Sequence, residues 1–269
     1  MIPKTILQTS RSNNLPSIFQ KIKDENEKVN NFAYKLWHHD SGEMNIDEFI
    51  KKEYGHLYDI YSKSQYGVQK ADIIRLVLLH YYGGIYIDTD ILFLKSMDTL
   101  IDYESDNVYI AMEPMEQTKK LYNNENVICN AFIAGPAKHP LFKEALDEIL
   151  RIYQRFGDNI FKVFNVFGGD LISKAMQSGN IFDSCKFVNR KLIYPINDPK
   201  FTDLPSSIAE AEMIKKGEYG NAYAVHYWIH SDFESKELLE KFIYNNNENL
   251  HQNMVRFFKE LYVNNHNLK

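Results

Sequence analysis

Two carboxylates, Asp88 and Asp90, stand two residues apart directly after the short apolar run 85–87. Because alternate residues of an extended chain point to the same side, both side chains can face one ligand. Carboxylate oxygens suit hard cations such as Mn²⁺ or Mg²⁺, which also bind diphosphate oxygens. Such a cation neutralises the charge that builds up on a departing nucleoside diphosphate. The pair therefore predicts a metal site for a substrate that contains a diphosphate.

An Asp-x-Asp pair also occurs by chance in surface turns, and it begins the calcium loop of EF-hands. The EF-hand interpretation fails, because Phe93 stands where that loop needs glycine and Thr99 where it needs glutamate. The context favours a functional site instead. Segment 69–82 is apolar almost all round, as in a buried helix, and Gly83-Gly84 ends it before the apolar run.

The same helical segment carries two charged residues, Asp72 and Arg75, three positions apart and hence on one face. Charges in so apolar a helix are costly unless they are paired or face a polar ligand. Two interpretations stay open. The residues form an internal salt bridge, or Asp72 accepts hydrogen bonds from sugar hydroxyls while Arg75 donates to hydroxyl or phosphate oxygens.

The elements that position these groups alternate between short apolar runs and helical spacing, which is typical of an α/β fold. Strands are expected at 6–9, 34–37, 85–87, 108–112, 131–134 and 223–228. Helices are expected at about 17–26, 45–64, 69–82, 140–154 and 169–176, followed by two amphipathic helices in 235–262. With no repeat or clear linker, we expect one domain over 1–269, with a helical C-terminal segment from about residue 235.

Composition excludes several classes of protein. The net charge is −5 and there is no long basic run, so a nucleic acid is not an expected partner. No apolar run approaches the roughly 20 residues that span a bilayer. The N-terminus lacks the regions of a signal peptide, and the two distant cysteines, Cys129 and Cys185, are expected to be reduced. We expect a cytoplasmic protein, with association of the C-terminal helices with a membrane surface left open.

The block over 69–90 resembles the glycosyltransferase 32 family, which contains capsular-polysaccharide and yeast-type mannosyl transferases with the glycosyltransferase-sugar DXD signature. It is also similar to the glucosyltransferase domain of the large clostridial toxins. Weaker similarity extends over much of the chain, at 2–8, 130–133, 139–141 and 226–228. The resemblance implies a GT-A fold, with a mixed, mainly parallel sheet flanked by helices. It also implies a divalent metal ion and retention of the anomeric configuration.

The resemblance also implies roles for single residues. Asp72 and Arg75 would hold the donor sugar, and Asp88 would contact ribose and sugar. Asp88 and Asp90 would ligate Mn²⁺ or Mg²⁺, with His226 as a last metal ligand, as a contact to the diphosphate, or as a structural histidine. Further donor contacts are expected from Thr9, Ser10, Asn130, Gly169, Asp170, Trp228, His230 and Ser231. The family often has Ser-Trp where this chain has Ser231-Asp232, so the contacts that close the site stay open.

The function expected from this resemblance is transfer of a hexosyl group from a nucleotide sugar to a saccharide or glycoconjugate acceptor. A UDP-sugar is favoured over GDP-mannose, and synthesis of a surface polysaccharide at the inner face of the membrane is the expected setting. Two alternatives remain. A metal-dependent phosphohydrolase or nucleotidyltransferase would need more acidic ligands around two metals. A non-catalytic carbohydrate-binding protein would be expected to have lost one of the two carboxylates.

Overall fold

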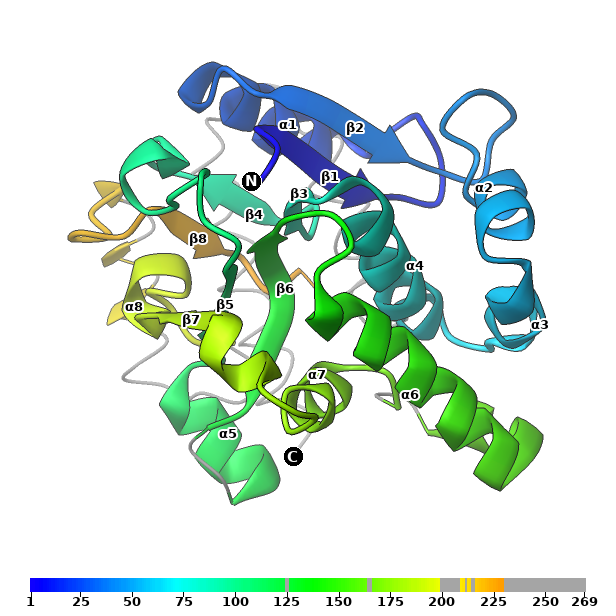
Figure 1. The fold of residues 1–269 in the computed structure, drawn as a ribbon. Helices are drawn as coiled ribbons and strands as arrows, with labels where there is room; N and C mark the ends of the chain where they lie inside the picture. The colour runs from blue at the N-terminus through cyan, green and yellow to red at the C-terminus, as the bar shows by residue number, and fades with distance from the viewer. Residues whose placement is uncertain (124–125, 164–165, 199–208, 211, 214–215, 230–269) are drawn as a thin grey trace, which may run out of the picture.

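The computed structural model describes residues 1–123, 126–163, 166–198, 209–210, 212–213 and 216–229. A six-stranded sheet forms its centre, in the order β2-β1-β3-β6-β5-β7 (Figure 1). The strands are β1 (Thr5–Thr9), β2 (Ala33–Trp37), β3 (Gly84–Ile87), β5 (Val108–Met112), β6 (Ile128–Gly135) and β7 (Cys185–Val188). Neighbours pair in parallel except β6, which is antiparallel to both β3 and β5. The expected mixed, mainly parallel sheet is confirmed.

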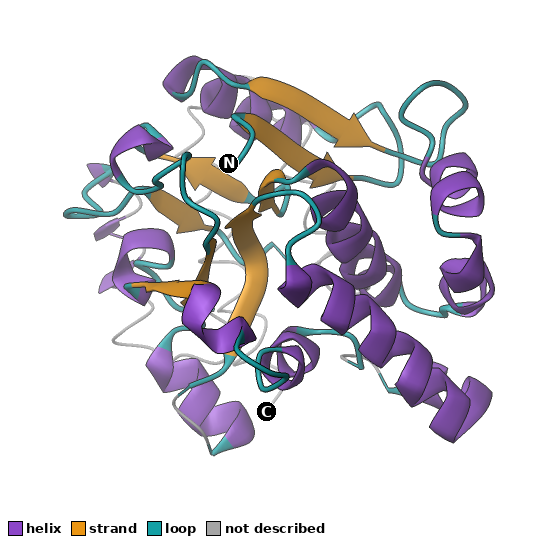
Figure 2. Cartoon of the chain, viewed as in Figure 1, coloured by secondary structure: helices purple, strands orange, loops and turns teal. Residues whose placement is uncertain are grey.

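Helices flank this sheet, and a small two-stranded ribbon lies beside it (Figure 2). The helices are α1 (Ser17–Val29), α2 (Ile46–Glu53), α3 (Gly55–Lys63), α4 (Gly67–Tyr82), α5 (Met115–Tyr122), α6 (Pro140–Phe156), α7 (Gly169–Ala175) and α8 (Arg190–Ile193). Short 3-10 helices occur at Met97–Thr99, Gly157–Lys162 and Ile181–Ser184. The ribbon pairs β4 (Ile91–Phe93) antiparallel with β8 (Ala224–His226).

The two faces of the sheet bury two separate cores, because successive strand residues point to opposite sides. In β3, Ile85 and Ile87 pack with α1 and the β4–β8 ribbon, whereas Tyr86 packs with α4 and α6. The neighbouring strand follows the same alternation, with Ile6 on the first face and Leu7 on the second. The sheet is therefore covered on both faces, as a mainly parallel sheet requires.

Two expected elements differ from the structure. The expected helix 45–64 is wrong as one unit, because Tyr54 leaves the helical conformation with φ −137° and ψ 41° and separates α2 from α3. Gly55, a poor residue for a helix interior, begins the second helix. The expected strand 223–228 is shorter than predicted, because Trp228 has a positive φ of 53° and the ladder with β4 ends at His226. The segment from residue 235 lies outside the described residues.

Both cysteines are free, as expected. Within the part of the chain that the structure describes, no helix combines the length and apolarity needed to cross a bilayer.

The polar residues gather at one edge of the sheet. Strands β1, β2, β3, β5 and β7 run in one direction, so their carboxyl ends meet at this edge, and the antiparallel β6 begins there. Asp88 follows β3, and Asn130 lies near the start of β6. Ligands of α/β sheets bind at the carboxyl ends of the strands. The topology therefore brings together residues that the chain spaces far apart.

Candidate active site

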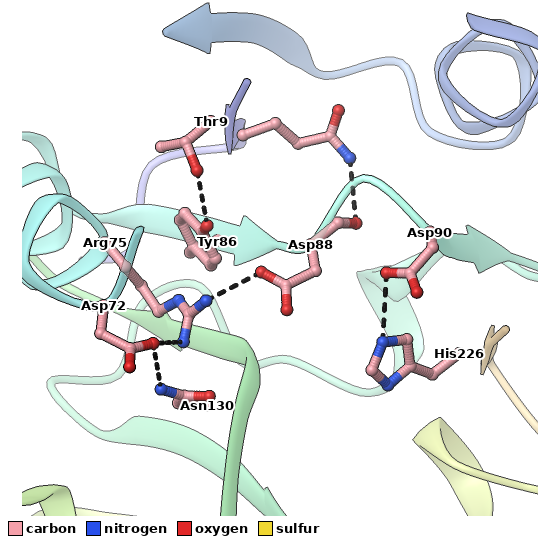
Figure 3. A network of polar contacts seen from close by, with 9 residues as sticks. Thr9, Asp72, Arg75, Tyr86, Asp88, Asp90, Asn130 and His226 are labelled. Carbon is pink, nitrogen blue, oxygen red and sulfur yellow. Dashed lines mark hydrogen bonds and ion pairs between the residues drawn. The ribbon is translucent and has the colours of Figure 1, made fainter. Parts of the chain in front are cut away.

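Arg75 links the charged residues of α4 to the first carboxylate after β3 (Figure 3). Its Nη1 donates to Asp72 Oδ1 and its Nη2 to Asp88 Oδ1, both at 2.9 Å. The side chains of Asp72 and Arg75 are each only 3% exposed, whereas Asp88 is 31% exposed. The two interpretations of Asp72 and Arg75 are thus compatible, because the buried salt bridge extends to a carboxylate that reaches the surface.

Asn130 completes the environment of Asp72 from the neighbouring strand β6. Its Nδ2 donates to Asp72 Oδ1 at 2.8 Å, on the same oxygen that accepts from Arg75. Burial raises the pKa of Asp72 to about 6, although Arg75 and Asn130 both favour the ionised form. Asp72 and Arg75, expected from helical spacing, and Asn130, expected from the family resemblance, therefore form one cluster.

Tyr86 supports the guanidinium group of Arg75 from inside the sheet. The guanidinium carbon lies 4.7 Å from the centre of the Tyr86 ring, in a cation–π contact. The Tyr86 hydroxyl lies 2.9 Å from Thr9 Oγ1 at the end of β1. The hydroxyl of Thr9, expected to contact the donor, is therefore engaged with Tyr86.

Asp90 and His226 form the second half of the site, on the β4–β8 ribbon. His226 Nε2 lies 3.1 Å from Asp90 Oδ1, and the backbone N–H of Ile229 donates to Asp90 Oδ2 at 2.7 Å. Burial raises the pKa of Asp90, but the charge and hydrogen bond of His226 outweigh it and hold that pKa below its ordinary value. Burial conversely lowers the pKa of His226, and the charge of Asp90 raises it well above the usual range.

Asp88, Asp90 and His226 each offer one ligand atom, and these atoms lie within 4.8 Å of one another. Two carboxylates and an imidazole fit a hard or borderline divalent cation, and the imidazole favours Mn²⁺ over Mg²⁺. His226 Nδ1 is buried without a hydrogen-bond partner. The donor set therefore matches the expected metal group.

Ser10 and Trp228 are described among the remaining expected donor contacts. Ser10 donates its backbone N–H to Trp37 at 2.8 Å. The Trp228 ring lies 4.0 Å from the His226 ring, and its indole N–H donates to Ile196 at 3.2 Å. His230 and Ser231 lie outside the described residues.

Gly169 and Asp170 begin α7 beside the start of β6. A Cβ on Gly169 would stand 1.8 Å from the carbonyl oxygen of Ile128, so only glycine allows this close approach. Asp170 is exposed. Burial is the main cause of the raised pKa of Glu113. The charge of Asp170 raises this pKa further, whereas the charge of His226 lowers it.

Sequence reasoning missed Gln8 and Tyr86. Gln8 is 1% exposed, and its Nε2 donates to the carbonyl oxygen of Asp88 at 3.2 Å. The available signal for Gln8 was its position, because it is a polar residue on the same strand face as the apolar Ile6. Tyr86 gave no such signal, because an aromatic residue in a buried strand reads as core.

Residues 13–106 match the family described as the glycosyltransferase sugar-binding region containing the DXD motif. This range includes Asp72, Arg75, Asp88 and Asp90, which lie close together in Figure 3. This part of the chain is therefore similar to a glycosyltransferase sugar-binding region. The match covers about a third of the chain, and Gln8, Asn130 and His226 lie outside it.

The chain is also similar in sequence to curated proteins. The chain is 39% identical over 93 residues to a mannosyl phosphorylinositol ceramide synthase of Saccharomyces cerevisiae, covering 34% of this chain and 23% of the relative. It is 24% identical over 159 residues to inositol phosphoceramide mannosyltransferase 1 of Schizosaccharomyces pombe, covering 58% and 45%. The chain thus spans less than half the length of either relative.

A solved structure extends the likeness of the fold over most of the chain. An active-site mutant of LgtC matches with a TM-score of 0.51 at 10% identity, covering 95% of this chain and 95% of that one. The expected GT-A fold of the glycosyltransferases is confirmed. At so low an identity the match concerns the fold alone.

Proposed function

We propose that this protein is a metal-dependent glycosyltransferase that moves a hexosyl group from a nucleoside diphosphate sugar to a saccharide or glycoconjugate acceptor. The observation that carries the proposal is the position of Asp88. Its carboxylate joins the Asp72–Arg75 pair on one side and the Asp90–His226 pair on the other. Sugar-binding groups and metal-binding groups therefore meet at one residue.

The chain's own residues divide the work of binding. Asp72 and Asn130 offer buried polar atoms to sugar hydroxyls, and Arg75 offers positive charge to hydroxyl or phosphate oxygens. Asp88, Asp90 and His226 would hold Mn²⁺, which when bound neutralises charge on the departing diphosphate. Thr9, Ser10 and Trp228 are candidates for nucleotide contacts, and Gly169 and Asp170 would border the donor or acceptor pocket.

The proposed reaction retains the anomeric configuration and needs no protein nucleophile. The acceptor hydroxyl approaches on the face that the diphosphate leaves, and the bond from the anomeric carbon to phosphate oxygen breaks. A new bond forms from that carbon to the acceptor oxygen, whose proton passes to an oxygen of the diphosphate. Positioning and stabilisation of the leaving charge supply the rate enhancement.

The test is a panel of UDP- and GDP-sugars, each with Mn²⁺, with Mg²⁺ and with chelator. UDP-sugars are the first candidates, and GDP-mannose follows because both relatives are named for mannosyl transfer. The proposal requires metal-dependent thermal stabilisation and slow donor hydrolysis with at least one donor. No response to any donor in the presence of Mn²⁺ would contradict it.

We expect Mn²⁺ binding to release about one proton at pH 7. The charge of Asp90 raises the pKa of His226 well above its usual value, so we expect the metal-free protein to carry a proton on this imidazole. Metal ligation needs the neutral ring, so apparent affinity rises with pH until the raised pKa is passed. Calorimetry in two buffers of different ionisation enthalpy measures the release.

The control for proton release is His226→Gln, which should bind Mn²⁺ more weakly and without this proton. Zero release with tight binding in the unaltered protein would contradict displacement of a proton from His226, and an unchanged Kd for Mn²⁺ in His226→Gln would remove His226 from the ligand set.

The two alternative functions predict different results in the same panel. A two-metal phosphohydrolase or nucleotidyltransferase would need a second set of acidic ligands, and the described residues contain one group of suitable spacing. A non-catalytic carbohydrate-binding protein would bind sugar without turnover.

We also propose a cellular compartment for this activity. Cytoplasmic action on a surface-glycan acceptor at the inner face of the membrane is compatible with the two free cysteines.

A further inference from the structure

Gln8 carries a buried amide side chain at the edge of the sheet where the strands end. The proposed reaction assigns no role to this side chain. It is the fourth residue of β1, and it is 1% exposed. Its Nε2 donates to the main-chain carbonyl oxygen of Asp88 at 3.2 Å, and its Oε1 accepts from the hydroxyl of Tyr34 in β2. A buried polar side chain with both ends engaged holds its partners in place.

The orientation of this amide follows from chemistry. The carbonyl oxygen of Asp88 can only accept a hydrogen bond, so the amide nitrogen of Gln8 must face it. The amide oxygen then faces Tyr34, whose hydroxyl must be the donor. The chain of bonds therefore runs in one direction, from Tyr34 through Gln8 to the main chain of Asp88.

The carbonyl of Asp88 receives a second donor from the turn that it begins. The backbone N–H of Ile91 donates to it at 3.1 Å, while the backbone N–H of Asp88 donates to Ala131 at 2.9 Å. Gln8 is thus the side chain that fixes the peptide plane between Asp88 and Thr89. That plane determines how far apart the carboxylates of Asp88 and Asp90 stand.

Thr9, the neighbour of Gln8, acts from the opposite face of the sheet. Its hydroxyl contacts Tyr86, whose ring supports Arg75, and Arg75 in turn holds the carboxylate of Asp88. Two consecutive residues of β1 therefore control Asp88 separately: Gln8 controls its main chain, and Thr9 controls its side chain through Tyr86 and Arg75.

We propose that Gln8 is a positioning residue for the metal site, and that it sets metal affinity by fixing the turn between Asp88 and Asp90. The inference rests on the proposed function, since it requires that these carboxylates bind a cation. It concerns the metal and leaves the identity of the sugar open.

The test is Gln8→Met, which keeps the length of the side chain and removes both hydrogen bonds. The readout is the Kd for Mn²⁺, from the fluorescence of Trp228, whose ring lies 4.0 Å from that of His226. Loss of a residue that orients metal ligands typically weakens affinity about 10- to 100-fold. We expect a loss in that range, with transfer activity that falls at limiting Mn²⁺ and recovers in large part with excess Mn²⁺.

Asn30→Leu is the matched control. Asn30 is also 1% exposed, and its Oδ1 accepts from the backbone N–H of Met97 at 2.9 Å. Met97 is not part of the group formed by Asp88, Asp90 and His226. This variant should lower the thermal midpoint and leave the Kd for Mn²⁺ unchanged. A purely structural role for Gln8 would give the same result in both variants and would overturn the inference.

Tyr34→Phe provides a second variant if Gln8→Met fails to fold. It removes the donor to Gln8 Oε1, so the amide loses its fixed orientation, and we expect a Kd for Mn²⁺ a few-fold weaker. An unchanged Kd in folded Tyr34→Phe would then overturn the inference. If the unaltered protein binds no Mn²⁺, the proposed function fails first, which distinguishes that failure from a failure at Gln8 alone.

Discussion

Asp90→Asn is expected to reduce metal-dependent transfer by about a thousandfold or more, while the fold is retained. A bound cation contributes several kcal/mol to transition-state stabilisation, and each 1.36 kcal/mol is about tenfold in rate. The variant replaces a carboxylate that lies beside His226 with a neutral amide. The amide oxygen can still accept from the backbone N–H of Ile229, so the ribbon should stay in place.

The measurement for Asp90→Asn is kcat/KM at saturating Mn²⁺, together with the thermal midpoint. The control is Asp98→Asn, which alters an exposed ion pair with Lys4 and should leave activity unchanged. Turnover of Asp90→Asn close to that of the unaltered protein would remove Asp90 from the metal site.

Arg75→Met is expected to destabilise the protein by about 3–5 kcal/mol, the usual cost of breaking a buried ion pair from one side. Arg75 and Asp72 are each 3% exposed, and Arg75 also holds Asp88. Its loss leaves the buried carboxylate of Asp72 without its counter-charge and removes the ion pair of Asp88. Urea unfolding measures the change in the free energy of unfolding.

The loss of stability in Arg75→Met should depend on pH. Burial already raises the pKa of Asp72 to about 6, and without Arg75 that pKa rises further above the unfolded value. The unfolded chain then binds fewer protons than the folded one as pH increases above about 4, so stability falls as pH rises. We expect a larger loss at pH 8 than at pH 5.

The double variant Arg75→Met/Asp72→Asn tests the cause of this loss. It removes the charge of Asp72 together with that of Arg75, and it should recover part of the stability. The surface control is Arg151→Met, whose side chain is 50% exposed and should cost about 1 kcal/mol or less. A loss in Arg75→Met no larger than in Arg151→Met would contradict the role of Arg75 as the counter-charge.

The parts of the site that could be predicted from sequence are those set by local periodicity. Helical spacing placed Asp72 and Arg75 on one face, and the strand end placed Asp88 and Asp90 together. Asp72 and Arg75 lie in one helix, and Asp88 and Asp90 follow the short strand that comes after it. Asn130 and His226 came only from the family resemblance, because strand order and antiparallel pairing bring them to the edge.

Other features depend on contacts that no local pattern contains. Gln8 reaches Asp88 because β1 pairs with β3, 80 residues along the chain. The break between α2 and α3 at Tyr54 was hidden by continuous helical spacing of apolar residues. The ribbon strand β4 was missed because Ile91–Phe93 is a strand only through its pairing with β8.

The β4–β8 ribbon has a consequence for the order of events during synthesis. Asp90 and His226 are 136 residues apart in the chain, and the ladder between Ile91 and His226 is what joins them. Closing a loop of this length costs conformational entropy, and His226 is synthesised after every strand of the six-stranded sheet. A nascent chain on the ribosome can therefore complete its sheet core before it acquires a competent cation site. Mn²⁺ affinity would then report that the β4–β8 ribbon has closed.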